Sequence, residues 1–245
     1  MTIEGRDMNT KNIWNKQIEL DSSSNKKILL GIVLDTTLSF AKVYPQIYYF
    51  LEHLLMNIES MKIKYDDFET AYSVVLLHDD AEVLKLTGDS SISKEEKDVI
   101  KKLAEISFYG GKKDGAEELG DAVQLQLTTM ERYCDLMKNR DCNISRELLI
   151  LTDSCATEGE QYRDFTKYNR CADGKKSYCG LQQAFIISYK SSYMPMLRMV
   201  NEDNRLAENN RNKCIFGDIE DLLKMDEEET LKAAERLAEK ITGMR

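Results

Sequence analysis

The stretch Lys26-Lys-Ile-Leu-Leu-Gly-Ile-Val-Leu-Asp-Thr-Thr-Leu-Ser39 decides the fold, because it joins an apolar segment directly to a polar turn. Its first part, from Lys26 to Asp35, is a nearly continuous apolar run that ends in an acid. Such runs are typical of strands that are buried on both faces, as in a parallel sheet covered by helices. The sequence therefore predicts a central strand that ends at Asp35.

Strands and helices are predicted to alternate along the rest of the chain. Apolar runs predict further strands at 72–77, 81–86, 147–153, 184–188 and 213–216. Apolar periodicity predicts helices at 40–62, 115–137 and 218–241, a helix within 191–210, and a helix to about 106 that Ser93 and Glu96 open with a capping box. This order predicts a doubly wound α/β fold, with a mostly parallel central sheet, one antiparallel edge strand and helices on both faces.

One domain is expected at 26–245, preceded by a polar N-terminal extension at 1–25. Its longest loop, at 154–180, contains three of the chain's six cysteines. Loops of this length inside a domain are usually functional or disordered. The three cysteines lack the short paired spacing of structural zinc ligands, so a zinc site is not expected there.

The composition argues against several classes of function. The formal net charge is −9, which disfavours nonspecific nucleic-acid binding because that binding depends on clustered Lys and Arg. No stretch approaches the roughly 20 apolar residues of a membrane span, and the N-terminus lacks the apolar core of a signal peptide. We expect a cytoplasmic protein that binds neither nucleic acid nor a membrane.

The turn after the first strand carries a carboxylate and two hydroxyls at alternate positions, Asp35, Thr37 and Ser39. Alternate side chains on a turn can converge on one point, and hard oxygens suit Mg²⁺, Mn²⁺ or Ca²⁺. Asp153 ends another predicted strand, and ligands of doubly wound sheets lie outside the carboxyl ends of the strands. The sequence therefore predicts a divalent-cation site at that edge.

Four segments resemble, in order, those of the von Willebrand factor type A (vWA) domain family: Asp35-x-Thr37-x-Ser39, Val75-Leu-Leu-His-Asp-Asp-Ala-Glu-Val83, Gly110-Gly111 and Leu149-Ile-Leu-Thr-Asp153. That family has D-x-S-x-S, a Gly-Gly-Thr segment and Leu-Leu-Thr-Asp-Gly, which form its metal-ion-dependent adhesion site. The resemblance covers about residues 26–241, and small cytoplasmic bacterial members are the most similar in size.

The resemblance implies a set of metal ligands and a function. Asp35, Thr37 and Ser39 would ligate the metal, and Asp153 would act directly or through a water. The remaining coordination position would accept an acidic side chain of a partner protein. We therefore expect a protein-binding module that is not an enzyme.

Lys112 stands where the family has its metal-binding Thr. An ammonium about 5 Å from a divalent ion would cost on the order of 6–7 kcal/mol at an effective dielectric constant of 20. Two alternatives follow. Either Lys112 points to solvent and Asp114 supplies an oxygen, or the ammonium replaces the cation and leaves a metal-free scaffold.

Two further interpretations remain for the same residues. Asp35 and Asp153 would cap helices if they were ordinary strand-end acids, and Ser39 would be the N-cap of the following helix. A phosphatase of the haloacid-dehalogenase type also has an Asp after its first strand, but it needs a second acid two residues later. Thr37 occupies that position here, so a hydrolase is the less favoured alternative.

Overall fold

The computed structural model describes residues 26–65, 68–111, 119–137, 143–153, 181–191 and 213–244. Within these ranges, seven strands form one sheet: β1 (Lys26–Asp35), β2 (Glu69–Leu77), β3 (Ala81–Val83), β4 (Ile92–Ser93), β5 (Asn143–Leu151), β6 (Leu181–Ser188) and β7 (Lys213–Asp218). The order across the sheet is β3-β2-β1-β5-β6-β7, and β4 pairs with β2. Strands β2, β1, β5, β6 and β7 are parallel, whereas β3 and β4 run antiparallel to β2.

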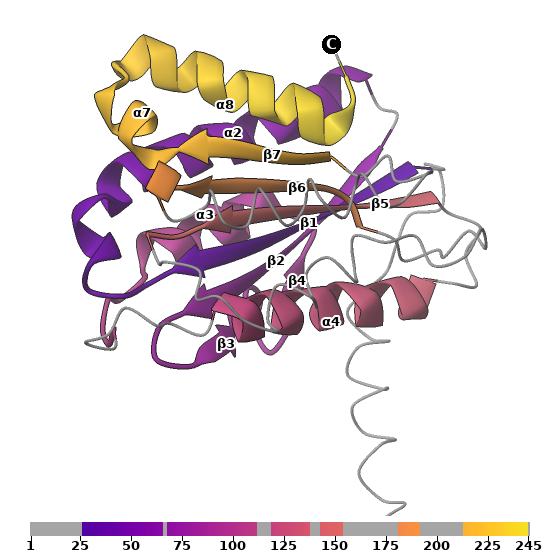
Figure 1. Cartoon of the computed structure of the whole chain (residues 1–245). Helices are drawn as coiled ribbons and strands as arrows, with labels where there is room; N and C mark the ends of the chain where they lie inside the picture. Colours follow the sequence, from indigo (N-terminus) through magenta and orange to yellow (C-terminus); the bar gives the residue numbers. More distant parts are fainter. Residues whose placement is uncertain are drawn as a thin grey trace, which may run out of the picture.

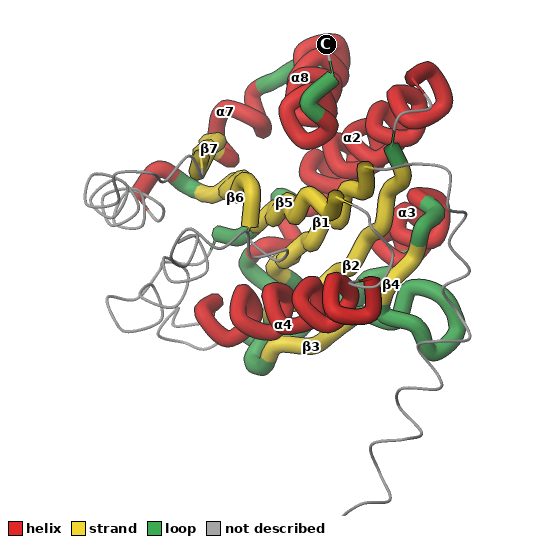
Figure 2. Tube along the Cα trace, turned by 90° about the vertical axis from the view of Figure 1, so that its right-hand side faces the viewer, coloured by secondary structure: helices red, strands yellow, loops and turns green. Residues whose placement is uncertain are grey.

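Helices cover both faces of this sheet (Figures 1 and 2). One face carries the short 3₁₀ helix η1 (Phe40–Lys42) and helices α2 (Tyr44–Tyr65), α3 (Glu96–Ala104), α7 (Ile219–Lys224) and α8 (Glu227–Thr242). Helix α4 (Leu119–Met137) packs on the other face. The predicted fold class is confirmed, and β4 adds a short antiparallel pairing that was not predicted.

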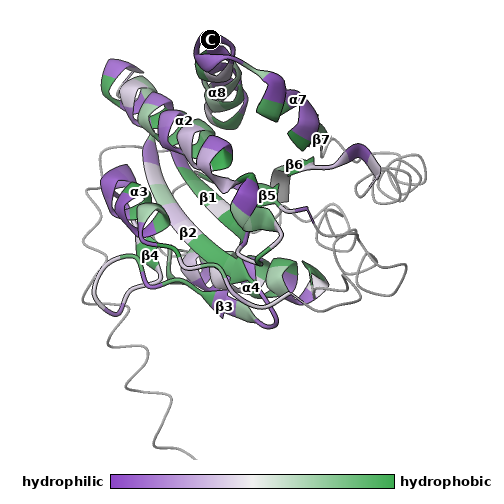
Figure 3. Cartoon of the chain, turned by 90° about the vertical axis from the view of Figure 1, so that its left-hand side faces the viewer, coloured by the Kyte–Doolittle hydropathy of each residue, from purple (hydrophilic) through white to green (hydrophobic). Residues whose placement is uncertain are grey.

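Strand β1 lies at the centre and is shared by two hydrophobic cores. Ile28, Leu30, Ile32 and Leu34 pack toward α2 and α8, whereas Leu29 and Val33 pack toward α4. Figure 3 shows the hydrophobic central strands between helices whose outer faces are hydrophilic. A strand with this burial must be apolar almost throughout, as the sequence predicted.

Gly31 allows α4 to approach β1 closely. A Cβ atom at this position would lie 2.5 Å from Nε2 of Gln126 and 2.6 Å from the sulfur of Met130. Gln126 is fully buried and donates a hydrogen bond to the hydroxyl of Ser73 on β2. The glycine in the centre of β1 is therefore explained by a close helix contact.

The predicted single helix at 218–241 is wrong, because the chain breaks between α7 and α8. The Asp226 carboxylate accepts a hydrogen bond from the Glu229 N–H at 2.8 Å, and Glu229 accepts one from the Asp226 N–H at 3.2 Å. This capping box starts a new helix at Glu227. Charged residues continue with helical periodicity across the break, so the apolar pattern alone did not reveal it.

The capping box predicted at Ser93 is also wrong. Ser93 belongs to β4, and α3 begins at Glu96 after an N-cap residue, Glu95, whose side chain makes no cap. The Ser93 hydroxyl accepts a hydrogen bond from the Glu95 N–H at 3.1 Å and donates one to Asp98 at 2.7 Å. Ser93 therefore stabilises the entry into the helix from two residues before the N-cap.

Several strands differ in length from the prediction. Strands β2, β5 and β6 begin three or four residues before their predicted starts. Their first paired residues include polar side chains, which interrupt the apolar runs used to predict strands. Lys27 and Glu69, for example, form a largely buried ion pair at 2.6 Å where β1 meets β2. Strand β3 is shorter than predicted, and β5 ends at Leu151 instead of Asp153. The extension at 1–25, the loop at 154–180 and nearly all of the helix predicted within 191–210 lie outside the described residues.

None of the helices in the described ranges has the length and apolar character needed to cross a membrane.

Glu147 is a buried carboxyl group in the middle of the sheet. Glu147 lies on β5 and is 1% exposed. Among the described residues its one hydrogen bond comes from the Ser145 hydroxyl, at 2.7 Å. Burial raises the pKa of Glu147 to about 8, although the Ser145 hydroxyl and the charge of Lys26 oppose the shift. The folded protein therefore holds this carboxyl protonated at neutral pH.

We predict that stability falls as the pH rises from about 4.5 to about 8. The unfolded chain releases the Glu147 proton near its ordinary pKa of 4.5, whereas the folded state keeps it until about 8. The difference corresponds to on the order of 5 kcal/mol across that range. Urea unfolding at several pH values should show the slope in the wild type, a flatter one in Glu147→Gln, and no change in the exposed control Glu235→Gln. An unchanged slope in Glu147→Gln would contradict the assignment.

Candidate metal centre

The candidate metal centre lies where β1 and β5 end, on the left-hand side of the sheet in Figure 1. The two strands are parallel neighbours with Leu34 opposite Leu151, so their carboxyl ends meet at one edge. Asp35 is the last residue of β1, and Asp153 follows the end of β5 by two residues. The sheet register therefore brings together two acids that are far apart in the sequence.

Four of the five predicted metal ligands form one hydrogen-bonded chain. The Thr37 hydroxyl donates to Oδ1 of Asp35 at 2.7 Å and lies 3.0 Å from the Ser39 hydroxyl. The Ser39 hydroxyl in turn donates to Oδ1 of Asp153 at 3.3 Å. The structure thus places Asp35, Thr37, Ser39 and Asp153 together. The fifth, Asp114, lies outside the described residues, as does Lys112.

The centre is buried on one side and open on the other. Asp35 and Thr37 are completely buried, Asp153 is half-buried and Ser39 is exposed. Burial raises the pKa of Asp35 to about 6, hydrogen bonds from Thr152 and Thr37 oppose this shift, and the charge of Asp153 adds to it. A divalent cation beside these carboxylates would offset the cost of desolvating them.

The helix-capping alternative accounts for only part of this geometry. Asp35 does cap the local turn, because its Oδ1 accepts a hydrogen bond from the Thr37 N–H at 2.9 Å. Ser39 occupies the N-cap position of η1, but its side chain makes no capping hydrogen bond. Its hydroxyl faces Thr37 and Asp153 instead, as a ligand group would.

Thr152, whose role the sequence pattern did not indicate, holds the second oxygen of the buried acid Asp35. The Thr152 hydroxyl donates to Oδ2 of Asp35 at 2.6 Å, and the side chain is 1% exposed. Its N–H also donates to the carbonyl of Ile187 on β6, at 3.2 Å. The signal was its position immediately before Asp153 at a strand end.

A second missed residue, Asp79, fixes the Gly110-Gly111 segment beside the centre. The Asp79 carboxylate accepts a hydrogen bond from the Gly111 N–H at 3.0 Å. Both glycines have positive φ, +73° and +99°, and a Cβ atom at Gly110 would lie 2.7 Å from the Asp79 carboxylate. The adjacent Tyr109 N–H donates to the carbonyl of Thr36 at 3.1 Å, which ties this segment to the turn after β1.

We predict that Gly110→Ala destabilises the protein by about 1–3 kcal/mol, because the side chain would be strained at positive φ and would collide with Asp79. Gly88→Ala is the matched control, since Gly88 has φ +55° but no atom near its would-be Cβ. Urea unfolding should show a smaller loss for Gly88→Ala. In an Asp79→Ala background the cost of Gly110→Ala should fall by at least about 0.5 kcal/mol. Additive effects of the two substitutions would rule out this contact.

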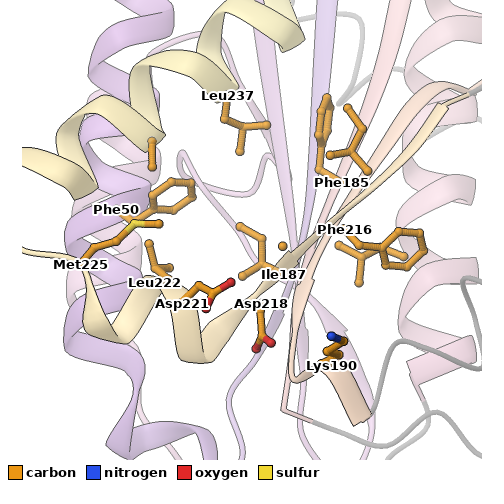
Figure 4. A pocket seen from close by; sticks show the side chains of 14 residues that line it. Phe50, Phe185, Ile187, Lys190, Phe216, Asp218, Asp221, Leu222, Met225 and Leu237 are labelled. Carbon is orange, nitrogen blue, oxygen red and sulfur yellow. The ribbon is translucent and has the colours of Figure 1, made fainter.

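A separate cavity of about 380 Å³ lies between β6, β7 and the helices α2, α7 and α8 (Figure 4). Phe50, Phe185 and Leu237 belong to its apolar wall, and Lys190 and Asp218 lie at one end. None of the four predicted metal ligands that the structure describes lines it. The cavity is therefore distinct from the candidate metal centre.

The donors at the centre are two carboxylates and two hydroxyls, which fits a hard cation such as Mg²⁺. Among the described residues, no group of three or more His, Cys, Asp or Glu side chains is arranged to hold a metal ion. That finding argues against a softer site of the zinc type in this part of the chain. It does not apply to the candidate centre, where hydroxyls supply half of the oxygens.

Comparison with solved structures identifies the known fold to which this architecture corresponds. No protein-family model matches the sequence, and no curated protein sequence matches it significantly. A solved structure described as von Willebrand factor type A from Catenulispora acidiphila matches with a TM-score of 0.57 at 12% identity, over 89% of this chain and 43% of its own. The chain has the vWA fold.

Two other solved vWA-like structures agree. An aerotolerance-related membrane protein from Bacteroides fragilis has a TM-score of 0.52 at 12% identity, covering 89% of this chain and 100% of that chain. The conserved hypothetical protein BatB from Bacteroides thetaiotaomicron has a TM-score of 0.50 at 12% identity, covering 88% and 99%. This chain spans less than half of the Catenulispora protein. At these identities the likeness establishes the fold, and function must be argued from the site.

Proposed function

We propose that this chain is a non-enzymatic protein-binding module that holds a divalent cation, Mg²⁺ or else Mn²⁺ or Ca²⁺, at the carboxyl ends of β1 and β5. The observation that carries the proposal is the hydrogen-bonded chain of Asp35, Thr37, Ser39 and Asp153. A cation would accept lone pairs from these four oxygens, and the two hydroxyls would keep their protons and direct them elsewhere. Asp114 would add an oxygen if Lys112 points to solvent, as the sequence predicts.

The open side of the centre suggests how a partner binds. Two carboxylates balance the charge of one divalent ion, and Ser39 is exposed to solvent. An acidic side chain of a partner would therefore meet a cation with a free coordination position on an accessible surface. The cation would supply the attraction, and the surrounding surface would supply selectivity. The cytoplasmic location expected from the sequence stays a prediction.

The hydrolase alternative receives no support from the geometry. The position two residues after Asp35 is Thr37, and its hydroxyl donates to Asp35. A hydroxyl in this role does not replace the acid that the phosphatase mechanism needs for proton transfer. The metal-free scaffold is the second candidate, because Lys112 would bring a positive charge into the position of a ligand.

Calorimetric titration of Mg²⁺ and Mn²⁺ into chelator-treated protein tests the centre. We expect wild-type binding to weaken by at least about tenfold in Asp153→Asn, since one of two carboxylate charges is lost. Asp35→Asn should have the same effect, and circular dichroism would verify that both variants fold. Asp221→Asn is the control, because this exposed acid lies on α7 beside the separate cavity. Absence of binding by the wild type, or unchanged binding by both variants, would refute the metal centre.

Substitution of Lys112 by Thr distinguishes the two candidates. If the wild type binds the cation as we propose, Lys112 points away and Lys112→Thr should change the metal affinity by less than about threefold. Lys113→Thr is the control for the loss of one positive charge. A gain of tenfold or more that is specific to Lys112→Thr would instead indicate that the ammonium occupies the place of the cation.

A further inference from the structure

Two large apolar side chains are exposed beside the candidate metal centre. Leu38 is 61% exposed and Tyr109 is 47% exposed. The Tyr109 N–H is bonded to the carbonyl of Thr36, two residues from Leu38, so both side chains belong to the edge that carries the ligands. Single exposed apolar residues are ordinary on a protein surface, but a pair that flanks a binding site deserves an explanation.

The position of Leu38 follows from the metal-binding turn. Its neighbours Thr37 and Ser39 both direct their hydroxyls into the hydrogen-bonded chain of the centre. The Leu38 side chain lies between them in sequence and is largely exposed to solvent, whereas Phe40, which follows Ser39, is completely buried. A polar side chain at this position would satisfy the turn equally well, so the local structure does not require the leucine.

His78 holds the Tyr109 side chain in place through two contacts. The Tyr109 hydroxyl lies 2.9 Å from Nε2 of His78, and the two rings are 4.5 Å apart between centroids. His78 itself is only 8% exposed, and its Nδ1 accepts a hydrogen bond from the Asp80 N–H at 3.3 Å. The ring of Tyr109 is therefore fixed before any partner binds, so little side-chain entropy remains to be lost.

We propose that this surface, Leu38 and Tyr109 beside the metal centre, binds a protein segment in which an acidic residue is directly adjacent to a large apolar residue. This inference rests on the proposed function, because the acidic side chain would bind the cation. The apolar neighbour would cover Leu38 or the face of Tyr109. Burial of a leucine-sized side chain in this way should strengthen binding roughly five- to tenfold.

Short capped peptides test the inference directly. The probes are acetyl-Gly-Asp-Leu-Gly-amide and its Leu-Asp reversal, a peptide with Ser in place of Leu, and a peptide with Asn in place of Asp. Amide chemical shifts of isotope-labelled protein in excess Mg²⁺ report each dissociation constant. We expect one of the two peptides that contain both Asp and Leu to bind roughly five- to tenfold more tightly than the peptide with Ser in place of Leu.

Surface variants assign that advantage to its source. Leu38→Ser should remove most of it, and Tyr109→Ala should reduce it. Ile63→Ser is the matched control, because Ile63 is 75% exposed near the end of α2, at the opposite edge of the sheet. The control should keep the full advantage, since only its distance from the centre distinguishes it.

Each other outcome has a definite meaning. Equal binding of all Asp peptides to the wild type would overturn the inference and leave the proposed function intact. Loss of Mg²⁺ dependence would overturn the proposed function and this inference with it. If the peptide with Asn and Leu binds as tightly as its Asp counterpart, the acidic side chain contributes nothing to binding. That outcome would overturn the inference and leave only an apolar contact. Concentration-dependent line broadening that Leu38→Ser removes, without peptide, would identify a second copy of the chain as the occupant and overturn the assignment.

Discussion

The parallel pairing of β1 with β2 and β5 is the constraint on which the rest of the structure depends. Nine consecutive residue pairs join β1 to each neighbour, and the side chains of β1 are shared between two cores. A slip of one residue would send every apolar side chain to the opposite core. The register therefore also fixes where β1 ends, and with it the place of Asp35 beside Leu77 on one strand and the end of β5 on the other.

Two buried carboxyl groups in the same sheet show how differently such a group can be accommodated. Among the described residues Glu147 has one hydrogen bond, from Ser145, and its pKa of about 8 means that it is buried as the neutral acid. Asp35 accepts hydrogen bonds from two hydroxyls and one N–H, and its pKa rises only to about 6. The donors around Asp35 favour the charged form, which is the form that a cation needs. The surroundings of Asp35 thus resemble a ligand environment, whereas those of Glu147 serve packing.

The sequence predicted the features that depend on local pattern. Apolar runs located β1 and the other long strands, and strand-end acids with alternate hydroxyls located the cluster of Asp35, Thr37, Ser39 and Asp153. Features that depend on contacts between distant segments were not predicted. Thr152 is bonded to a residue 117 positions away, and Asp79 is bonded to Gly111 across 32 positions. The break between α7 and α8 was missed for another reason, since the charged residues of the capping box also fit a continuous helix.

The two halves of the candidate centre are held by different means, and this bears on how binding is tuned. Asp35, Thr37 and Asp153 are fixed by the ends of central strands, where the sheet register leaves little freedom. The segment from Tyr109 to Gly111 is fixed by the side chains of His78 and Asp79, which come from the turn between β2 and β3. Side-chain contacts on a turn are easier to alter than a strand register, because the cores do not depend on them. Cation binding should therefore depend mainly on the ends of β1 and β5. The selectivity for a partner should depend on Leu38 beside these ends and, as the part that is easier to alter, on the turn and the glycine segment that hold Tyr109.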